Sequence, residues 1–331
     1  MGKGSALDTS RAGRRIIERP RLTRLLTESE SRVMLLVAPA GYGKTTLARQ
    51  WLSDQRHAWY QASPASSDVA ALALGLAAAA ADVSPGVGDH IRGRLKTVGD
   101  AATEARSLAA DLAEDFRHWP RDVRFVIDDY QLLAESDAAE VFIDEFVRAT
   151  SFPLLVTSRS RPAWVSAKSL LYGEVIELGR NVLAMTHAEA AEALAKTHEE
   201  LPGLVSLAEG WPAVIGLAAL VPYPLTEGAS EIPETLHQYF AEELYDAVSA
   251  DERWNAAQLS IAPLTNDIVA RALFGNRYGT VLERAYRCGF LTKAGSGYEM
   301  HPLVRQFLRT KLADFATDRV RESAEAIANA Y

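Results

Sequence analysis

The chain has 331 residues, of which 48% are hydrophobic and 24% are charged. This length and composition are typical of a folded protein with two or three domains and exclude a disordered chain. The net charge of −8 argues against a non-specific nucleic-acid binder. The single cysteine, Cys288, excludes an internal disulfide and fits a reducing compartment.

The N-terminal stretch is basic, with six arginines between positions 11 and 24. We leave open whether this arm is solvated or folds over a nearby site. It lacks the apolar segment of a signal peptide. The longest apolar run, 69–81, is shorter than the roughly 18 residues of a membrane-spanning helix. We therefore expect no membrane contact and a cytoplasmic location.

A glycine-rich loop follows the first predicted strand, which covers 33–37. The loop reads Ala38-Pro-Ala-Gly-Tyr-Gly-Lys-Thr45, and a helix-prone stretch follows it. Strand, glycine loop and helix in this order indicate a P-loop, whose backbone N–H groups hold phosphates. We predict that ATP or ADP contacts Ala40, Gly41, Tyr42, Gly43, Lys44, Thr45 and Thr46. Lys44 would reach the β- and γ-phosphates, and the Thr45 hydroxyl would be a ligand of Mg²⁺.

Two carboxylates end a later strand. After a strand at 58–60 and helices at 68–82 and 101–117, the stretch 124–129 is a hydrophobic strand that ends in Asp128 and Asp129. A strand that ends in Asp is common by itself, because Asp favours turns. Together with a P-loop, the first acid is expected to hold Mg²⁺ through water and the second to position the attacking water. We predict both as catalytic residues and Asp128 also as a metal residue.

An arginine follows the next strand, 154–157. Arg159 lies just past the carboxyl end of that strand, where the ligands of open α/β sheets bind. We predict that it senses the γ-phosphate as a catalytic residue; the alternative is a surface salt bridge. The same alternatives hold for Arg161, which precedes a proline. A fifth strand at 175–178 completes a parallel sheet, and the fold class is an α/β P-loop NTPase domain.

The remainder of the chain is predicted to be helical. Alanine-rich helices over 186–220 are interrupted by Pro202-Gly203 and by Gly210-Trp-Pro212, and helices at 234–249, 251–262 and 265–274 follow a proline-rich joint. A hairpin within 289–300 and a helix from Pro302 then favour a winged helix. The last helix, 317–331, has no C-cap residue, so we expect that the chain was cut there. The predicted domains are a basic arm (1–22), a P-loop domain (23–180), a small all-helical domain (181–228), a winged-helix domain (229–315) and the start of a helical extension (316–331).

Six motifs occur in a fixed order: Arg19-Pro-Arg-Leu22, the P-loop, Val126-Ile-Asp-Asp-Tyr130, Thr157-Ser-Arg159, Glu209-Gly-Trp-Pro212 and Met300-His-Pro-Leu303. This ordered set resembles the signal-transducing STAND ATPases and, within them, the MalT-like, large LuxR-type transcriptional regulators. The resemblance implies that Gly210 and Pro212 contact the nucleotide from the helical domain. It implies that His301 contacts the β-phosphate and holds an ADP-bound resting form. We also place Arg19 at the nucleotide, and we interpret Trp211 as core packing.

The resemblance implies an ATP- or ADP-dependent switch. ADP would hold a closed monomer, ATP with Mg²⁺ would favour an open, self-associating form, and slow ATP hydrolysis would at most reset it. Inducer and DNA contacts would belong to regions absent from this chain. The alternative is a stand-alone ATPase or kinase. DNA binding by the winged helix is disfavoured, because residues 231–331 hold 11 Lys and Arg against 14 Asp and Glu, a net of −3.

Overall fold

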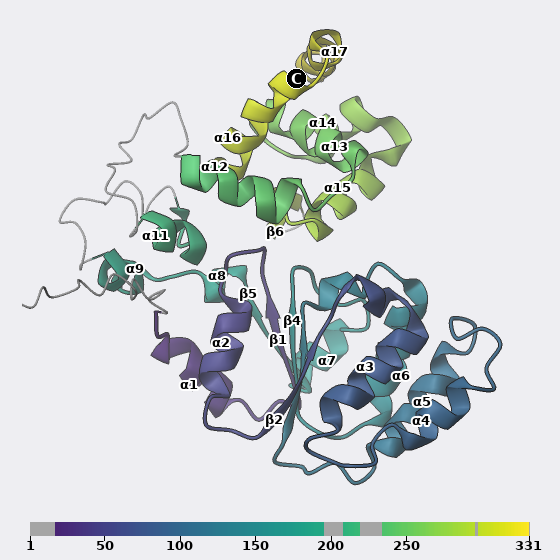
Figure 1. Ribbon diagram of the computed structural model, residues 1–331. Coiled ribbons are helices and arrows are strands. Elements are labelled where there is room, and N and C mark those ends of the chain that lie inside the picture. The colour runs from purple at the N-terminus through teal and green to yellow at the C-terminus, as the bar shows by residue number, and fades with distance from the viewer. Residues whose placement is uncertain (1–16, 195–207, 219–233, 295–296, 331) are drawn as a thin grey trace, which may run out of the picture.

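The structure is a computed structural model that describes residues 17–194, 208–218, 234–294 and 297–330. Its centre is a five-stranded parallel sheet with the strand order β2-β3-β4-β1-β5 (Figure 1). The strands are β1 (Val33–Val37), β2 (His57–Gln61), β3 (Arg124–Asp128), β4 (Leu154–Ser158) and β5 (Val175–Gly179). All five strands were predicted from the sequence, and the α/β fold class is confirmed.

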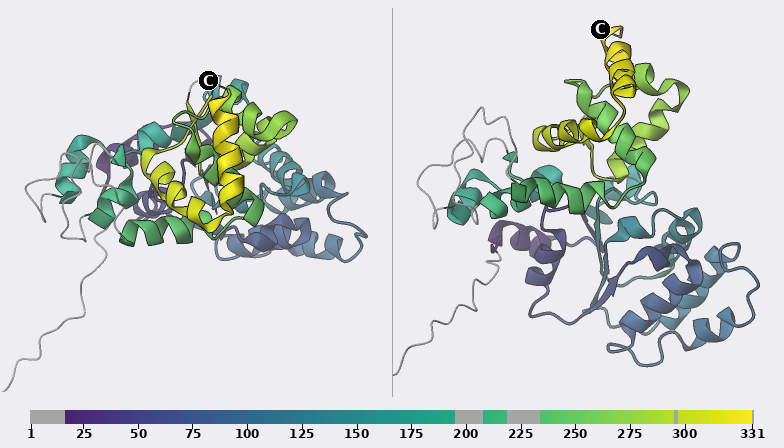
Figure 2. Two further views of the ribbon diagram at one scale, coloured as in Figure 1. Left: turned by 90° about the horizontal axis from the view of Figure 1, so that it is seen from above. Right: turned by 45° about the horizontal axis from the view of Figure 1, so that its top comes forward.

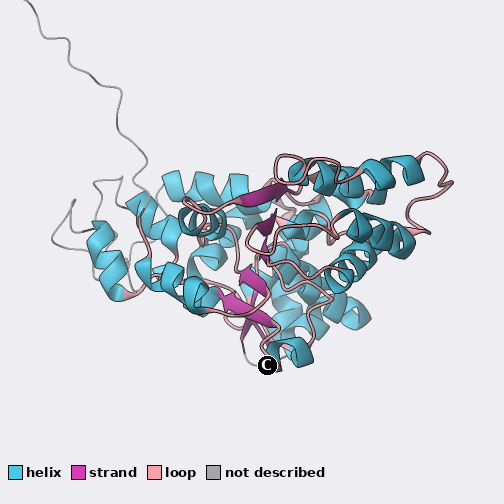
Figure 3. Cartoon of the chain, turned by 90° about the horizontal axis from the view of Figure 1, so that it is seen from below, coloured by secondary structure: helices cyan, strands magenta, loops and turns pink. Residues whose placement is uncertain are grey.

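Helices cover both faces of the sheet, as seen along its edge in Figure 3. They are α1 (Pro20–Glu28), α2 (Lys44–Trp51), α3 (Val69–Ala80), α4 (Asp89–Leu95), α5 (Ala105–Asp115), α6 (Asp137–Ala149), α7 (Ala167–Leu171) and α8 (Arg180–Leu183). Alternate residues of β1 enter two different cores, since successive side chains of a strand point to opposite faces. Val33 and Leu35 pack with α3 to α6, whereas Met34 and Leu36 pack with α1 and α2.

Beyond the sheet, the described chain is almost entirely helical. Two short helices, α9 (His187–Leu194) and α11 (Pro212–Ala218), come first. The C-terminal part then consists of α12 (Glu234–Phe240), α13 (Ala250–Ile261), α14 (Asp267–Phe274), α15 (Tyr278–Arg287), the hairpin β6 (Thr292–Ala294) and β7 (Gly297–Glu299), α16 (Pro302–Lys311) and α17 (Thr317–Ala328). Helices, hairpin and helix in this order match the expected winged-helix arrangement.

The C-terminal part lies over the edge of the sheet where the P-loop is found (Figures 1 and 2). The core on the α1–α2 face continues without a break through Trp211 and Phe240 to Phe307 of α16. The glycine-rich loop is therefore packed into the same core as the C-terminal helices. Among the described residues, no helix combines the length and the apolar character that a membrane crossing requires.

Some local expectations were wrong or fall outside the described residues. Helix α4 was not predicted. The predicted helix over 234–249 is instead α12 followed by a π-helical turn at Ala241–Tyr245. The arginines at positions 11, 14 and 15, the Pro202-Gly203 break and the proline-rich joint lie outside the described residues.

Candidate functional site

The loop between β1 and α2 has the backbone that phosphate binding requires. Gly41 and Gly43 have φ angles of 77° and 75°, in the left-handed region that favours glycine. A Cβ on Gly41 would lie 2.6 Å from Ala213 Cβ and 2.8 Å from Trp211 Nε1. Gly43 is the N-cap of α2, and no side chain caps the helix at this position. The N-terminal N–H groups of this helix are thus available to an anion.

Lys44 is held inside this loop. Its side chain is buried, and Nζ donates hydrogen bonds to Ala38 O at 2.8 Å and to Pro39 O at 3.0 Å. Burial, and then the charge of Arg159, lower the pKa of Lys44 to about 8. A polyphosphate beside Nζ would favour the charged form and reverse this shift.

The first carboxylate of β3 lies beside the start of α2. Asp128 Oδ1 accepts a hydrogen bond from Thr45 Oγ1 at 2.9 Å and another from Thr157 Oγ1. Asp128 Oδ2 is buried and has no hydrogen-bond partner among the described residues. Burial raises the pKa of this carboxyl, although the two threonine hydroxyls act in the opposite direction. A hydroxyl next to a partly unpaired carboxylate is a donor set that suits Mg²⁺.

The second carboxylate, Asp129, directly follows the carboxyl end of β3. Asp129 has a φ of 57°, and its backbone N–H donates to Thr157 Oγ1 at 3.1 Å. Its carboxylate accepts hydrogen bonds from Gln61 Nε2 at 2.7 Å and Gln131 Nε2 at 2.9 Å. Strained backbone of this kind occurs at functional sites. Each amide therefore holds one oxygen of the carboxylate.

A cavity of about 550 Å³ opens beside the loop. Its walls come from segments far apart in the sequence: the N-terminal arm, the P-loop with α2, the helix α11, and α12 with the turn after it. The lining residues are Ile17, Arg19, Gly41, Gly43, Thr46, Leu47, Gln50, Met185, Pro212, Ala213, Gly216, Tyr239 and Glu243. Of the predicted nucleotide contacts, Arg19, Gly41, Gly43, Thr46 and Pro212 lie on this wall.

Tyr239 contributes a polar group to this cavity. Its Oη points at Gly41 and is buried without a hydrogen-bond partner among the described residues. Burial raises the pKa of Tyr239, so the hydroxyl keeps its proton. An unpaired buried hydroxyl is costly unless a partner supplies a hydrogen bond, so its position suits a polar ligand.

Arg19 is a buried residue of the arm. Its guanidinium donates to Leu183 O at 2.7 Å, to Ala184 O at 2.9 Å and to Glu189 Oε2 at 3.2 Å. These contacts fix the start of α1 against the segment that follows β5. The part of the arm that the structure describes is therefore folded against the cavity, which is the second of the two alternatives for this stretch.

Trp211 joins the loop to the C-terminal part. Its Nε1 donates to Ala40 O at 3.0 Å, and its ring stacks on Tyr42 with centroids 5.7 Å apart. The rings of Trp211 and His301 form a T-shaped pair with their centroids 4.9 Å apart. Trp211 is buried in the core, as expected, and it also contacts the phosphate loop directly. The side chain of Tyr42 faces this cluster, so only its backbone can face a phosphate.

His301 is buried against Trp211 and does not reach the cavity. Its Nδ1 accepts from Leu303 N at 3.2 Å, and its Nε2 lies 3.2 Å from Ala208 O. It is not among the residues that line the cavity. Its contact with a β-phosphate stays a prediction.

The two arginines after β4 differ in their partners. Arg159 Nη1 donates to Glu243 O at 3.2 Å, and Nη2 lies 3.9 Å from the Glu243 carboxylate. Arg161 pairs with Glu177 of β5 through Nε at 2.5 Å and Nη2 at 3.1 Å. Arg159 thus connects the end of β4 to the turn after α12, whereas the ion pair of Arg161 stays within the sheet.

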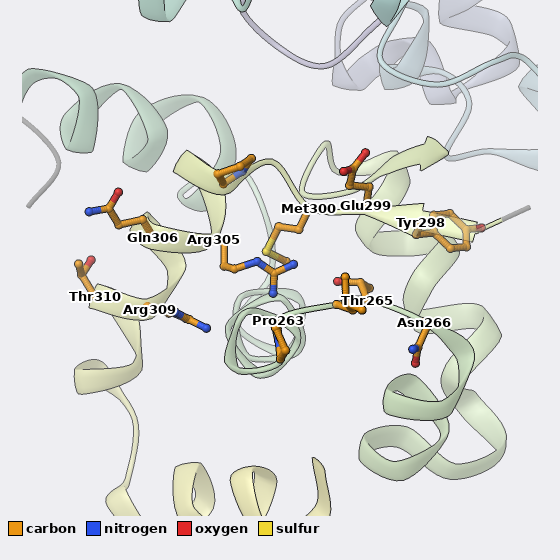
Figure 4. A pocket seen from close by; sticks show the side chains of 12 residues that line it. Pro263, Thr265, Asn266, Tyr298, Glu299, Met300, Arg305, Gln306, Arg309 and Thr310 are labelled. Carbon is orange, nitrogen blue, oxygen red and sulfur yellow. The ribbon is translucent and has the colours of Figure 1, made fainter. Parts of the chain in front are cut away.

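A larger cavity, of about 880 Å³, lies in the C-terminal part, away from the P-loop (Figure 4). Two arginines of α16 line it, and both are bonded to the end of α13. Arg305 contacts Ala262 O, and Arg309 Nε donates to Ser260 O at 3.0 Å. Cations at the C-terminus of a helix stabilise it, which accounts for these side chains without a ligand.

No protein-family model matches the chain. It is 27% identical to the HTH-type transcriptional regulator MalT of Yersinia enterocolitica over 313 residues, which are 88% of this chain and 34% of that protein. MalT of Yersinia pestis gives the same values. The chain is therefore MalT-like over most of its length, and the predicted resemblance is confirmed. It spans about a third of the length of these relatives.

One of two similar solved structures has a TM-score high enough to show the same fold. A Walker-type ATPase of Pyrococcus abyssi is similar over 88% of this chain and 96% of that one, with a TM-score of 0.55 and 15% identity. A STAND protein with a tetratricopeptide repeat sensor from Pyrococcus horikoshii covers 95% of this chain, with 48% of its own chain, a TM-score of 0.39 and 16% identity. The P-loop ATPase fold is confirmed, and it implies nucleotide binding.

Several residues of the site carry no motif. Tyr239 and Glu243 reach the cavity from nearly 200 residues beyond the loop, and Gln61 and Gln131 hold Asp129. Only the two glutamines could have been found from the sequence. Gln61 ends a strand that is parallel and adjacent to β3, and Gln131 is two residues after Asp129.

Proposed function

We propose that this chain is the ATP- or ADP-dependent switch module of a MalT-like transcriptional regulator. The observation that carries the proposal is the composition of the cavity beside the P-loop. Its walls come from the α/β part, from α11 and from α12. A nucleotide bound there would contact all three, so its affinity would depend on how these parts are docked. Inducer and DNA contacts belong to regions outside this chain, and we propose a cytoplasmic location.

The phosphate end of the site has its own residues. Lys44 would leave the carbonyl groups it now contacts and bind the β- and γ-phosphates. Thr45 and Asp128 are the residues that would hold Mg²⁺, which neutralises phosphate charge when bound. Asp129, held by two amides, would accept a hydrogen bond from an attacking water. We propose slow hydrolysis as the reset step.

Arg159 offers a way to distinguish ATP from ADP. It now contacts Glu243, which follows α12. A γ-phosphate would compete for this guanidinium and weaken its contact with the C-terminal part, whereas ADP has no γ-phosphate. We propose that ADP therefore favours a closed monomer and ATP an open, self-associating form. A full change from 1:99 to 99:1 requires about 5.5 kcal/mol of differential binding, to which Arg159 and Lys44 would both contribute.

The test begins with the purified chain. Denaturation followed by chromatography identifies any bound nucleotide, and calorimetry measures the uptake of ADP and of ATP with Mg²⁺. Light scattering should then find a monomer with ADP and a larger species with a non-hydrolysable ATP analogue. Absence of bound nucleotide together with absence of uptake contradicts the proposal. Turnover at or above about 1 s⁻¹ without an activator would favour the stand-alone enzyme instead.

A further inference from the structure

Arg180 connects three distant regions of the chain. It is the first residue of α8, directly after β5, and its side chain is 18% exposed. Nε donates to Tyr42 Oη at 2.9 Å, and Nη1 donates to Thr292 Oγ1 at 2.9 Å. Nη2 donates to Glu209 Oε2 at 2.6 Å. We call these four residues the Arg180 cluster.

Each partner in the Arg180 cluster belongs to a different part of the site. Tyr42 is the middle residue of the phosphate loop, and its ring stacks on Trp211. Thr292 begins the hairpin of the C-terminal part, and Glu209 precedes α11. A planar guanidinium with donors in fixed directions can hold three such acceptors at once.

The backbone at Glu209 supports a specific role for this contact. Glu209 and Gly210 have φ angles of 46° and 74°, and a left-handed glutamate is unfavourable. A Cβ on Gly210 would lie 2.6 Å from Met185 O, so only glycine fits at this position of the turn. This strained turn directs the Glu209 carboxylate to Arg180. Strain of this kind persists only where the surrounding contacts enforce it.

We infer that Arg180 is a positioning residue that couples the conformation of the phosphate loop to the docking of the hairpin. This inference rests on the proposed function and adds the regulation of the same site. When a nucleotide changes the loop, Tyr42 can shift only by losing its bond to Arg180 or by drawing the guanidinium away from Glu209 and Thr292. The state of the loop is thus transmitted to the hairpin through one side chain.

Arg161 provides the matched control. Both arginines line one cavity of about 530 Å³ next to Pro39. The side chain of Arg161, however, forms its ion pair with Glu177 of β5, which belongs to the same sheet. Removal of either charge alters the same cavity, but only removal of Arg180 breaks bonds between parts of the molecule.

The test measures docking without nucleotide. Spin labels are placed at two exposed positions on opposite parts of the full chain, Asp54→Cys and Asn276→Cys, in a Cys288→Ser background. Pulsed electron–electron double resonance then gives the distribution of distances between the two labels. We expect Arg180→Gln to raise the ratio of undocked to docked molecules at least tenfold, Arg180→Lys to raise it less, and Arg161→Gln to leave it unchanged. Equal distributions for Arg180→Gln and Arg161→Gln overturn the inference.

Two further measurements keep the result decisive. If Arg180→Gln does not fold, Glu209→Gln removes the charge of one partner and Thr292→Val removes one bond, and each should raise the undocked fraction; no change in either would overturn the inference. The dissociation rate of a fluorescent ADP analogue should also rise severalfold in Arg180→Gln but not in Arg161→Gln. If no variant binds nucleotide, the proposed function fails, while the label distances still decide the role of Arg180.

Discussion

Protonation of His301 should destabilise the folded chain in mild acid. Both ring nitrogens are engaged in the neutral form: Nδ1 accepts from Leu303 N, so Nε2 carries the proton and donates to Ala208 O. A second proton on Nδ1 would face the N–H of Leu303 and break the cap of α16. Burial, and then the charge of Arg180, lower the pKa of His301 from 6.5 to about 4.

The size of the effect follows from this shift. Below pH 6.5 the unfolded chain binds a proton that the folded chain refuses until pH about 4, so the stability falls as the pH drops through this window. Each pKa unit corresponds to about 1.36 kcal/mol, which gives about 3 kcal/mol in total and about 2 kcal/mol by pH 5. His301 is 5% exposed, so solvent screening is small.

The assay is urea unfolding at pH 7.5 and at pH 5. His301→Asn keeps an oxygen that can accept from Leu303 N but removes the titrating ring. We expect this variant to lose about 2 kcal/mol less stability between the two pH values than the unaltered chain does. His57→Asn is the control, because His57 is exposed. If the unaltered chain and His301→Asn lose the same stability, the reasoning about His301 is refuted.

Three other predictions concern the loop and its acids. Lys44→Ala should abolish nucleotide binding, and the affinity of the unaltered chain should fall up to tenfold per pH unit above about 8, because the bound state retains the lysine proton; a flat calorimetric pH profile contradicts this. Asp129→Ala should leave the ATP affinity within about threefold while phosphate release falls at least 100-fold; normal release shows that another group positions the water. Gly41→Ala should lower stability by at least about 1–2 kcal/mol, because its φ is 77° and its Cβ would crowd Ala213, and should abolish binding. In Gly279→Ala, a helical position with open space, stability should not fall; equal losses in the two variants would show that crowding is not the cause.

The centre of the sheet could be predicted because β1, β3 and β4 are buried on both faces. Parallel strands of this kind are continuous apolar runs, as in Val33–Val37, and such runs are distinct in the sequence. Helix α4 was missed because it has only seven residues, includes Gly93 and buries a single side chain, Ile91. A helix of that length has almost no periodic signal and depends on tertiary contacts for its stability.

The grouping of residues around the P-loop could also be predicted, but the rest of the cavity could not. Lys44, Thr45 and Asp128 are fixed by strands that end at one edge of the sheet, so local motifs locate them. Tyr239 and Glu243 reach the cavity because α12 docks onto the loop. That docking depends on packing between segments far apart in the chain, for which no sequence motif exists.

The contacts of Trp211 explain how a residue of the core could take part in the proposed switch. It lies in the core, but its indole N–H bonds to Ala40 O, and Ala213 N donates to Gly41 O at 3.0 Å. Two carbonyl groups of the phosphate loop are therefore held by the start of α11. Close-packed cores move between discrete arrangements rather than deform gradually. A change in the loop must move Trp211, and Trp211 is in contact with both Phe240 of α12 and His301 of the C-terminal part. In the proposed switch, the same residue that fills the core would thus carry a displacement from the P-loop to the helices beyond it.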